Sequence, residues 1–326
     1  MQVYFGGYSP NVEKAELDQQ LTAAAPFLAC NCATYLRQDG RLLFAIKRES
    51  QKGGVAVFDL ASKKQVGEYL TPGASPAYLG LNPEKKLLYC ANYHTGWLTV
   101  LRYDESGRLG LVAKTQHEGS GPAPEQDAAH PHFFDETPAG NLLCCDLGTD
   151  QVVIYKLADS QLVKLASWQA PAGVGPRHAA FANGLLYVVC ELGSRLLVLD
   201  FDEDKLSFKL LHSYSTVAAS YAGHNGAAAL RVDPAGGFVY VSNRGEDTIA
   251  VFRQEKKALR LIQRISTFGA FPRDFAWNDE NIAIAANQET SSATVYRRDP
   301  HSGCLTLLQK QVPAAKPTCV LFGAEF

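Results

Sequence analysis

The stretch FVYVSNR, residues 238–244, decides the fold, because close variants of it recur along the whole chain. Each copy begins as a short apolar strand and ends in small or polar residues. The other copies are LLFAIKR at 42–48, LLYCANY at 87–93, LLCCDLG at 142–148, LLYVVCE at 185–191 and IAIAANQ at 282–288. The third residues of successive copies, from Phe44 to Ile284, are 45, 55, 43, 53 and 44 residues apart. Such spacing marks an array of similar structural units.

Each unit carries the signals of four short strands. A phrase containing proline precedes most copies, as SPAYL at 75–79, HPHFF at 130–134, GPRHA at 175–179, FPRDF at 271–275 and KPTCV at 316–320. After each copy comes an alternating strand such as TIAVFR at 248–253, and then a weaker one such as LRLIQRI at 259–265. Four strands per 40–50 residues are typical of a β-propeller blade.

The two ends of the chain supply one further blade. Six internal repeats are complete, KPTCVLF at 316–322 resembles an inner strand without followers, and QVYFGGY at 2–8 resembles a second strand without a predecessor. Pairing them closes the array and removes two exposed sheet edges. We therefore expect an all-β chain, residues 1–326, that forms one seven-bladed β-propeller domain.

Composition excludes several classes of partner. The 31 basic and 33 acidic residues are interspersed and give a net charge of −2, which argues against nucleic acid or an acidic membrane as partner. No apolar run approaches the ~20 residues that span a bilayer, and the first residues lack the features of a secretion signal. The eight cysteines show no metal-binding spacing and are expected to be reduced and mostly buried. The sequence thus predicts a cytoplasmic protein. A monomer or weak homodimer is expected, although no feature of the composition selects between them.

Two positions of each repeat are expected to meet at one rim of the propeller. The first follows the repeat's proline and is occupied by Ala77, His132, Arg177, Arg273 and Thr318. The second lies four residues past the third residue of each copy and is occupied by Arg48, Tyr93, Gly148, Glu191, Arg244 and Gln288. Four of these are arginines, whose planar fork suits carboxylate and phosphate. A small anionic ligand is therefore expected at this rim.

The segment AHPHFF at 129–134 admits three interpretations. His130 and His132 share a face of an extended strand, a spacing that suits a metal, with His178 or Glu191 as a third ligand; the nearby arginines would repel a cation. The pair could instead belong to a proline-fixed turn. The favoured interpretation makes His132 an active-site group and His130 a support for the turn, with no metal.

The order of motifs resembles a known family. HPHFF, DLGTD at 146–150, GPRHAAF at 175–181, CEL at 190–192, VYVSNRGEDTIAVF at 239–252, FPRDFAW at 271–277 and AANQ at 285–288 are similar to the seven-bladed-propeller lactonases. That family includes bacterial 6-phosphogluconolactonases and fungal carboxy-muconate lactonizing enzymes. The resemblance covers essentially the whole chain. In this family a Ser is common at the position of Phe133. The family usually has a stretch similar to GTYT where this chain has FGGYSP at 5–10.

The resemblance implies a metal-free and cofactor-free catalytic group of His132, Glu191, Arg177 and Arg244. It implies hydrolysis of a sugar lactone, 6-phosphoglucono-1,5-lactone to 6-phosphogluconate, a step of the pentose phosphate pathway. Either His132 or Glu191 would be the general base, with His132 favoured because free imidazole titrates near neutral pH. The substrate-binding residues expected beside this group are Arg273, for the phosphate, and His130, His178, Asn243, Gln288 and Arg48.

Two other functions stay open on the sequence alone. The carboxy-muconate lactonizing relatives would use the same four residues for an intramolecular addition. A propeller can also be a non-enzymatic interaction module, since fold alone does not give function. A third class, the six-bladed, metal-dependent gluconolactonases, is disfavoured by the seven repeats and the cationic rim.

Overall fold

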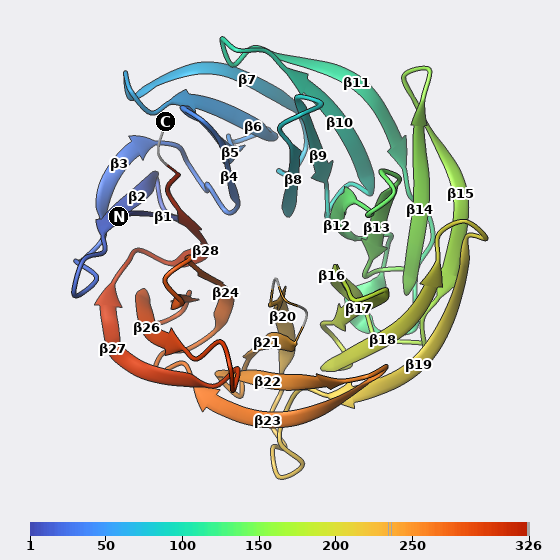
Figure 1. Cartoon of the computed structure of the whole chain (residues 1–326). Helices are drawn as coiled ribbons and strands as arrows, with labels where there is room; N and C mark the ends of the chain where they lie inside the picture. The colour runs from blue at the N-terminus through green and yellow to red at the C-terminus, as the bar shows by residue number, and fades with distance from the viewer. Residues whose placement is uncertain (234, 236, 325–326) are drawn as a thin grey trace. The chain divides into compact units, whose positions relative to one another are not determined.

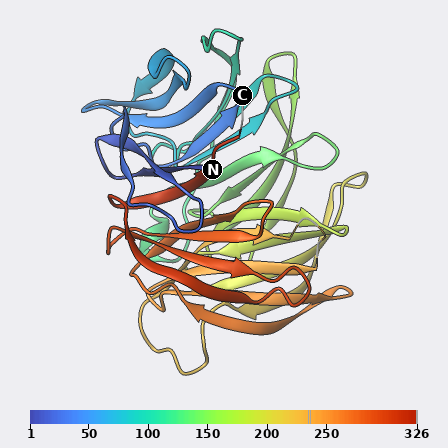
Figure 2. The same ribbon diagram turned by 60° about the vertical axis from the view of Figure 1, so that its left-hand side comes forward.

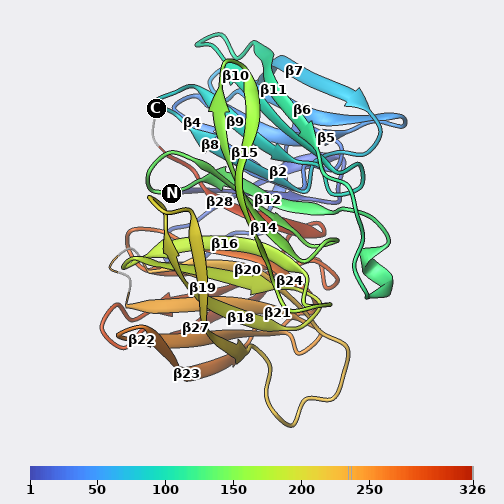
Figure 3. The ribbon, with the colours of Figure 1, turned by 90° about the vertical axis from the view of Figure 1, so that its right-hand side faces the viewer.

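A computed structural model of the chain describes residues 1–233, 235 and 237–324. Residues 234, 236, 325 and 326 of the predicted domain lie outside the described residues. The described residues form seven four-stranded sheets and a single short helix, η1 (Pro124–Gln126). Figure 1 labels these elements, and Figure 3 shows η1 in the loop that joins β11 to β12.

Three sheets contain the strands from β4 to β15, each in sequence order. They are β4 (Leu36–Asp39), β5 (Leu42–Arg48), β6 (Lys52–Asp59) and β7 (Lys64–Pro72); β8 (Tyr78–Asn82), β9 (Leu87–Ala91), β10 (Trp97–Tyr103) and β11 (Leu109–Gln116); and β12 (Pro131–Glu136), β13 (Leu142–Asp146), β14 (Gln151–Ala158) and β15 (Gln161–Gln169).

Three more sheets contain the strands from β16 to β27 in the same order. They are β16 (Pro176–Ala182), β17 (Leu185–Cys190), β18 (Arg195–Asp202) and β19 (Ser207–Ser215); β20 (Gly226–Val232), β21 (Phe238–Arg244), β22 (Thr248–Glu255) and β23 (Ala258–Ser266); and β24 (Pro272–Trp277), β25 (Ile282–Asn287), β26 (Ser292–Arg298) and β27 (Leu305–Pro313).

The two ends of the chain form the remaining sheet, as predicted. Its strands are β28 (Pro317–Phe322), β1 (Gln2–Gly7), β2 (Asn11–Glu16) and β3 (Ala25–Ala29), in that order. β28 runs antiparallel to β1, with Cys319 opposite Gly6 and Phe322 opposite Val3. In Figures 1 and 2 the red C-terminal strand lies beside the dark-blue N-terminal strands. Seven four-stranded sheets are the blades expected of a seven-bladed β-propeller.

Burial explains why the repeat has its pattern. The second strand of a sheet is covered on both faces, and β9, β13, β17, β21 and β25 are buried along their whole length. The third residue of each copy, from Phe44 to Ile284, is at most 1% exposed. Burying such a side chain contributes about 1.5–3 kcal/mol. The fourth strands, such as β15 and β19, alternate half-buried with exposed residues, which is why their sequences are less apolar.

The chain divides into two compact units. Unit 1 comprises Met1–Phe27, His178–Phe201 and Phe208–Gly323. Unit 2 comprises Leu28–Arg177 and Asp202–Ser207, together with Ala324. No helix among the described residues is long and apolar enough to cross a membrane.

All eight cysteines are free thiols, and six of them are buried. Burial raises the pKa of the Cys30 and Cys90 thiols to about 12, so the reactive thiolate is scarce at these positions. Cys32 and Cys304 are partly exposed.

We therefore expect thiol labelling of the native protein to be selective. At pH 8, Ellman's reagent should modify Cys32 and Cys304 first, and the six buried thiols only when the protein is unfolded in denaturant. The release of thionitrobenzoate before and after unfolding checks this. Rapid modification of all eight thiols in the native protein would contradict it.

Candidate active site

In β12 and β24, the residue after the repeat's proline is the extra residue of a β-bulge. In β12, Pro131 lies opposite Asp146 and Phe133 opposite Cys145, which leaves His132 without a counterpart on β13. In the same way β24 has Arg273 as its extra residue, between Pro272 opposite Asn287 and Asp274 opposite Ala286. A bulge re-aims a side chain and is frequent beside active sites. The side chains of His132 and Arg273 therefore do not follow the regular alternation of the residues beside them in β12 and β24.

Glu191 and Arg244, both in unit 1, form an ion pair. Glu191 directly follows β17 and Arg244 ends β21, and the distance from Glu191 Oε2 to Arg244 Nη2 is 2.7 Å. The side chain of Arg244 is 6% exposed and that of Glu191 is 21% exposed. Arg244 also donates to the carbonyl oxygens of Gly226 and Ala227, at 3.2 and 3.4 Å. The guanidinium is thus fixed, while its Nη1 forms no hydrogen bond with any described residue.

A glycine and a strained phenylalanine make room for Arg244 and support it. A Cβ at Gly226 would lie 2.7 Å from Arg244 Nη2 and 3.4 Å from Glu191 Cγ, so the ion pair lies where only a glycine fits. The ring of Phe271 packs against the guanidinium, 5.0 Å from its centroid to Cζ. Phe271 has a φ of 66°, which costs a bulky residue about 1–3 kcal/mol. Its N–H donates to Asp247 Oδ1 at 2.7 Å, so an aspartate of the motif at 239–252 holds the backbone of Phe271.

The remaining expected residues of unit 1 differ in what they can reach. Asn243 is fully buried, and its amide bonds to Thr216 O, Thr248 Oγ1 and Asn225 Nδ2. Such a side chain is held rigidly and can position its neighbour Arg244. Arg273 and Gln288 are partly exposed, and Arg273 Nη1 donates to Gln288 Oε1 at 3.2 Å. His178 is buried on β16.

In unit 2, His130 and Tyr93 hold each other, and Tyr93 contacts His132. The rings of Tyr93 and His130 stack with centroids 4.3 Å apart, and the His132 ring meets the Tyr93 ring edge-on at 5.7 Å. His130 Nδ1 lies 2.8 Å from Tyr93 O, and its Nε2 lies 2.9 Å from Asp127 Oδ1. The hydrogen bond from His130 lowers the pKa of Asp127. His130 thus supports the segment around His132.

Two further expected residues belong to unit 2. Arg177, at the start of β16, is almost fully buried. Arg48, at the end of β5, is exposed. Burial, and then the charges of His130 and Arg48, lower the pKa of His94.

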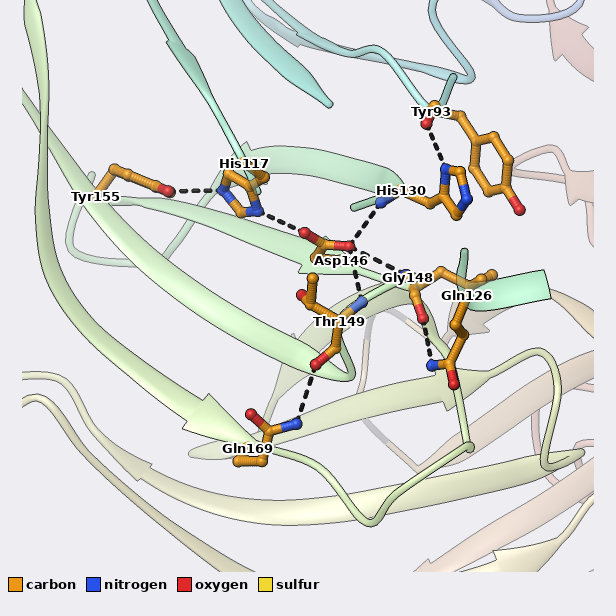
Figure 4. A network of polar contacts seen from close by, with 10 residues as sticks. Tyr93, His117, Gln126, His130, Asp146, Gly148, Thr149, Tyr155 and Gln169 are labelled. Atoms are coloured by element: carbon orange, nitrogen blue, oxygen red, sulfur yellow. Dashed lines mark hydrogen bonds and ion pairs between the residues drawn. The ribbon is translucent and has the colours of Figure 1, made fainter. Parts of the chain in front are cut away.

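Asp146, the first residue of DLGTD, is the centre of a buried hydrogen-bond network (Figure 4). Its Oδ1 accepts the backbone N–H groups of His130, Gly148 and Thr149 at 2.8, 3.0 and 3.2 Å. Its Oδ2 lies 2.6 Å from His117 Nδ1, and Tyr155 OH lies 2.6 Å from His117 Nε2. The carboxylate therefore fixes the backbone two residues before His132. Nothing in the sequence distinguished His117, because it is brought to Asp146 only by the folded chain.

The other residues of DLGTD also position neighbouring segments. A Cβ at Gly148 would lie 1.9 Å from Ala128 O and 2.7 Å from His130 N, so the glycine admits the backbone that leads to His132. Asp150 accepts the N–H groups of Gly173 and Gly175 at 2.6 and 2.8 Å. Gly175 directly precedes Pro176 and Arg177, and Gly173 lies two residues before Gly175. The motif thus orders the approaches to two of the four expected catalytic residues.

Replacing Asp146 tests this role. Asp146→Ala leaves three buried N–H groups without an acceptor and should lower the free energy of unfolding by about 3 kcal/mol. Asp146→Asn keeps an oxygen for the N–H groups and should cost only about 1 kcal/mol. Urea unfolding followed by circular dichroism measures both. Equal losses for the two variants would show that the three backbone hydrogen bonds do not matter.

The site residues offer no evident metal centre. Among residues 1–233, 235 and 237–324, no group of three or more His, Cys, Asp or Glu side chains is arranged to hold a metal ion.

Known proteins share both the sequence and the fold. The sequence model of the family "Lactonase, 7-bladed beta-propeller" matches residues 2–322. A 6-phosphogluconolactonase from Bacillus subtilis is 33% identical, over 98% of this chain and 96% of its own. A crystal structure of a protein from Lactobacillus plantarum is 38% identical, with a TM-score of 0.94 over 98% of both chains. The periplasmic gluconolactonase of Pseudomonas aeruginosa is 26% identical, with a TM-score of 0.87 over 99% of both chains.

These matches confirm the predicted seven-bladed β-propeller and the predicted resemblance. They extend over nearly the whole chain and include every motif on which the resemblance was based. The chain belongs to the seven-bladed β-propeller lactonase family.

Proposed function

We propose that the protein is a cytoplasmic lactone hydrolase that converts 6-phosphoglucono-1,5-lactone to 6-phosphogluconate in the pentose phosphate pathway, without a metal or other cofactor. The observation that carries the proposal is the fixed guanidinium of Arg244, held by Glu191 at 2.7 Å with Nη1 left to donate. A preorganised cation of this kind suits the negative charge that develops on a lactone carbonyl oxygen. The 33% identity to a 6-phosphogluconolactonase supports this substrate.

The proposed reaction begins with attack of water on C1 of the lactone. His132 is the general base that takes the proton from this water, because free imidazole titrates near neutral pH. Arg244, with Arg177, stabilises the oxyanion of the tetrahedral intermediate. When the intermediate collapses, the bond from C1 to the ring oxygen breaks, and His132 returns the proton to that oxygen. The product is the open-chain acid.

The other residues have supporting roles in this proposal. Glu191 orients Arg244 through the ion pair. His130 positions His132, and Asn243 positions Arg244. The substrate is bound by His178, Arg48, Gln288 and Arg273. The proposed protein is a monomer or weak homodimer.

The experiment is a panel of freshly prepared lactones with the purified protein, measured against spontaneous hydrolysis. We expect 6-phosphogluconolactone to be hydrolysed well above background, with the same rate in the presence of a chelator. Glucono-1,5-lactone and a carboxylated muconolactone are the comparison substrates. Preferential turnover of the muconolactone, or loss of activity with the chelator, would contradict the proposal.

A further inference from the structure

Arg273 carries a positive charge that no carboxylate of the described chain neutralises. Among the described residues, its one hydrogen bond runs from Nη1 to Gln288 Oε1 at 3.2 Å, and no carboxylate of those residues lies within 4.0 Å of it. The adjacent Asp274 is instead paired with Arg231, at 2.5 Å. Arg244, by contrast, is paired with Glu191. Arg273 therefore keeps most of its N–H donors, and its full charge, available for a ligand.

The side-chain amide of Gln288 is oriented with its oxygen, Oε1, toward Arg273. Its Nε2 donates to Glu289 Oε1 at 2.7 Å, which directs Oε1 toward the guanidinium. The backbone N–H groups of Gln288 and Glu289 donate to Phe271 O and Ala270 O, both at 3.1 Å. Glu289, the acidic side chain of this segment, thus bonds to the far end of the Gln288 amide. Gln288 holds one edge of Arg273 without cancelling its charge.

Tyr8 covers one face of the same guanidinium. The Arg273 Cζ lies 5.6 Å from the centroid of the Tyr8 ring, and Tyr8 is 40% exposed. Its backbone is fixed, because Tyr8 N donates to Lys316 O at 3.1 Å. Tyr8 lies four residues past Tyr4 in QVYFGGY, so it has the same place in its repeat as Arg244 and Gln288 in theirs. A stacked guanidinium keeps its N–H donors in the plane, where they can form two parallel hydrogen bonds to an oxyanion.

We infer that Arg273, stacked on Tyr8 and braced by Gln288, forms a subsite for a phosphate monoester dianion. Arg273 and Tyr8 would then be the residues that select a phosphorylated lactone over the unphosphorylated one. This inference rests on the proposed function, since the phosphate is that of the lactone being hydrolysed. It assigns to Tyr8 a role in specificity that the six internal repeats alone do not reveal.

The test compares two substrates across matched variants. Arg273→Gln should lower kcat/KM for 6-phosphogluconolactone by about 100-fold, the equivalent of one charge-assisted pair, and that for glucono-1,5-lactone by less than about 3-fold. Arg273→Lys should recover only part of the loss, because a lysine cannot form the fork. Tyr8→Ala should lower the preference for the phosphorylated lactone by about 5-fold, as loss of a cation–π contact implies, and Tyr8→Phe should not. The control is Arg297→Gln, which removes an exposed charge from β26.

The outcomes separate this subsite from the proposed function. Equal losses with both substrates, or an Arg297→Gln variant that behaves like Arg273→Gln, would overturn the subsite and leave the lactonase activity intact. If the wild type hydrolyses neither lactone, the proposed function fails, and calorimetric titration with 6-phosphogluconate and gluconate decides the subsite. Binding of 6-phosphogluconate alone, lost in Arg273→Gln, would support it. Absence of binding, or equal binding of both acids, would refute it.

Discussion

Replacing His132 by alanine is expected to lower kcat for 6-phosphogluconolactone hydrolysis by about 10²- to 10⁴-fold, the range for a general base. The reason is that the variant lacks the proposed base that takes the proton from the attacking water. KM should change little, because the imidazole acts on water and not on the substrate's phosphate. Initial rates of acid release, corrected for spontaneous hydrolysis, measure the effect.

A matched variant tests whether removal of a different histidine also lowers kcat. His212→Ala removes an exposed histidine from β19 and should leave kcat unchanged. Thermal unfolding of both variants shows whether the fold is kept. If a folded His132→Ala protein retains a wild-type kcat, His132 is not the base.

Replacing Arg244 by glutamine is expected to lower kcat/KM by about 10²- to 10³-fold, as for loss of an oxyanion donor. The variant removes the guanidinium whose Nη2 pairs with Glu191 at 2.7 Å. Arg244→Lys should restore only a small part, because an ammonium cannot bind Glu191 and the substrate in one plane. Rates at several substrate concentrations give kcat and KM separately.

Gly226→Ala disturbs the guanidinium of Arg244 without changing Arg244 itself. The added methyl group would lie 2.7 Å from Arg244 Nη2, so it displaces the arginine without removing its charge. The variant should lose activity in the same direction as Arg244→Gln, though by less. Full activity in both Gly226→Ala and Arg244→Gln would exclude Arg244 from the reaction.

The fold could be predicted from the sequence because the positions at which apolar residues recur are the positions that are buried in the folded chain. The third residue of each copy lies where a second strand is covered on both faces, so the chain repeats a large apolar residue there, as at Tyr187 and Tyr240. The pairing of β28 with β1 was predictable for a second reason. Each of the two end segments matched part of a repeat whose missing strands the other end supplies.

The site was only partly predictable. His132 and Arg273 stood out by their place after the repeat's proline, but the β-bulge that re-aims them depends on the register between two strands. His117 and Gly226 act through contacts with Asp146 and Arg244 that arise only in the folded chain. Asn243 was expected among the substrate-binding residues. Its complete burial, with its amide bonded to Thr216, Thr248 and Asn225, makes it a positioning residue.

Tyr8 shows the limit of counting internal copies. Its repeat is divided between the two ends of the chain and is therefore not among the six internal copies. The strand order β28, β1, β2, β3 agrees with a place for Tyr8 equivalent to that of Arg244. The exposed ring of Tyr8 and its contact with Arg273 are the observations from which we infer that Tyr8 belongs to a phosphate subsite.

The most direct test of the account is the initial rate at which the wild-type protein and His132→Ala form 6-phosphogluconate from freshly generated 6-phosphogluconolactone. We expect the wild type to exceed the spontaneous rate by a wide margin and the variant to remain close to it. A wild-type rate equal to spontaneous hydrolysis would contradict the proposed substrate, and equal catalysed rates for both proteins would contradict the role of His132.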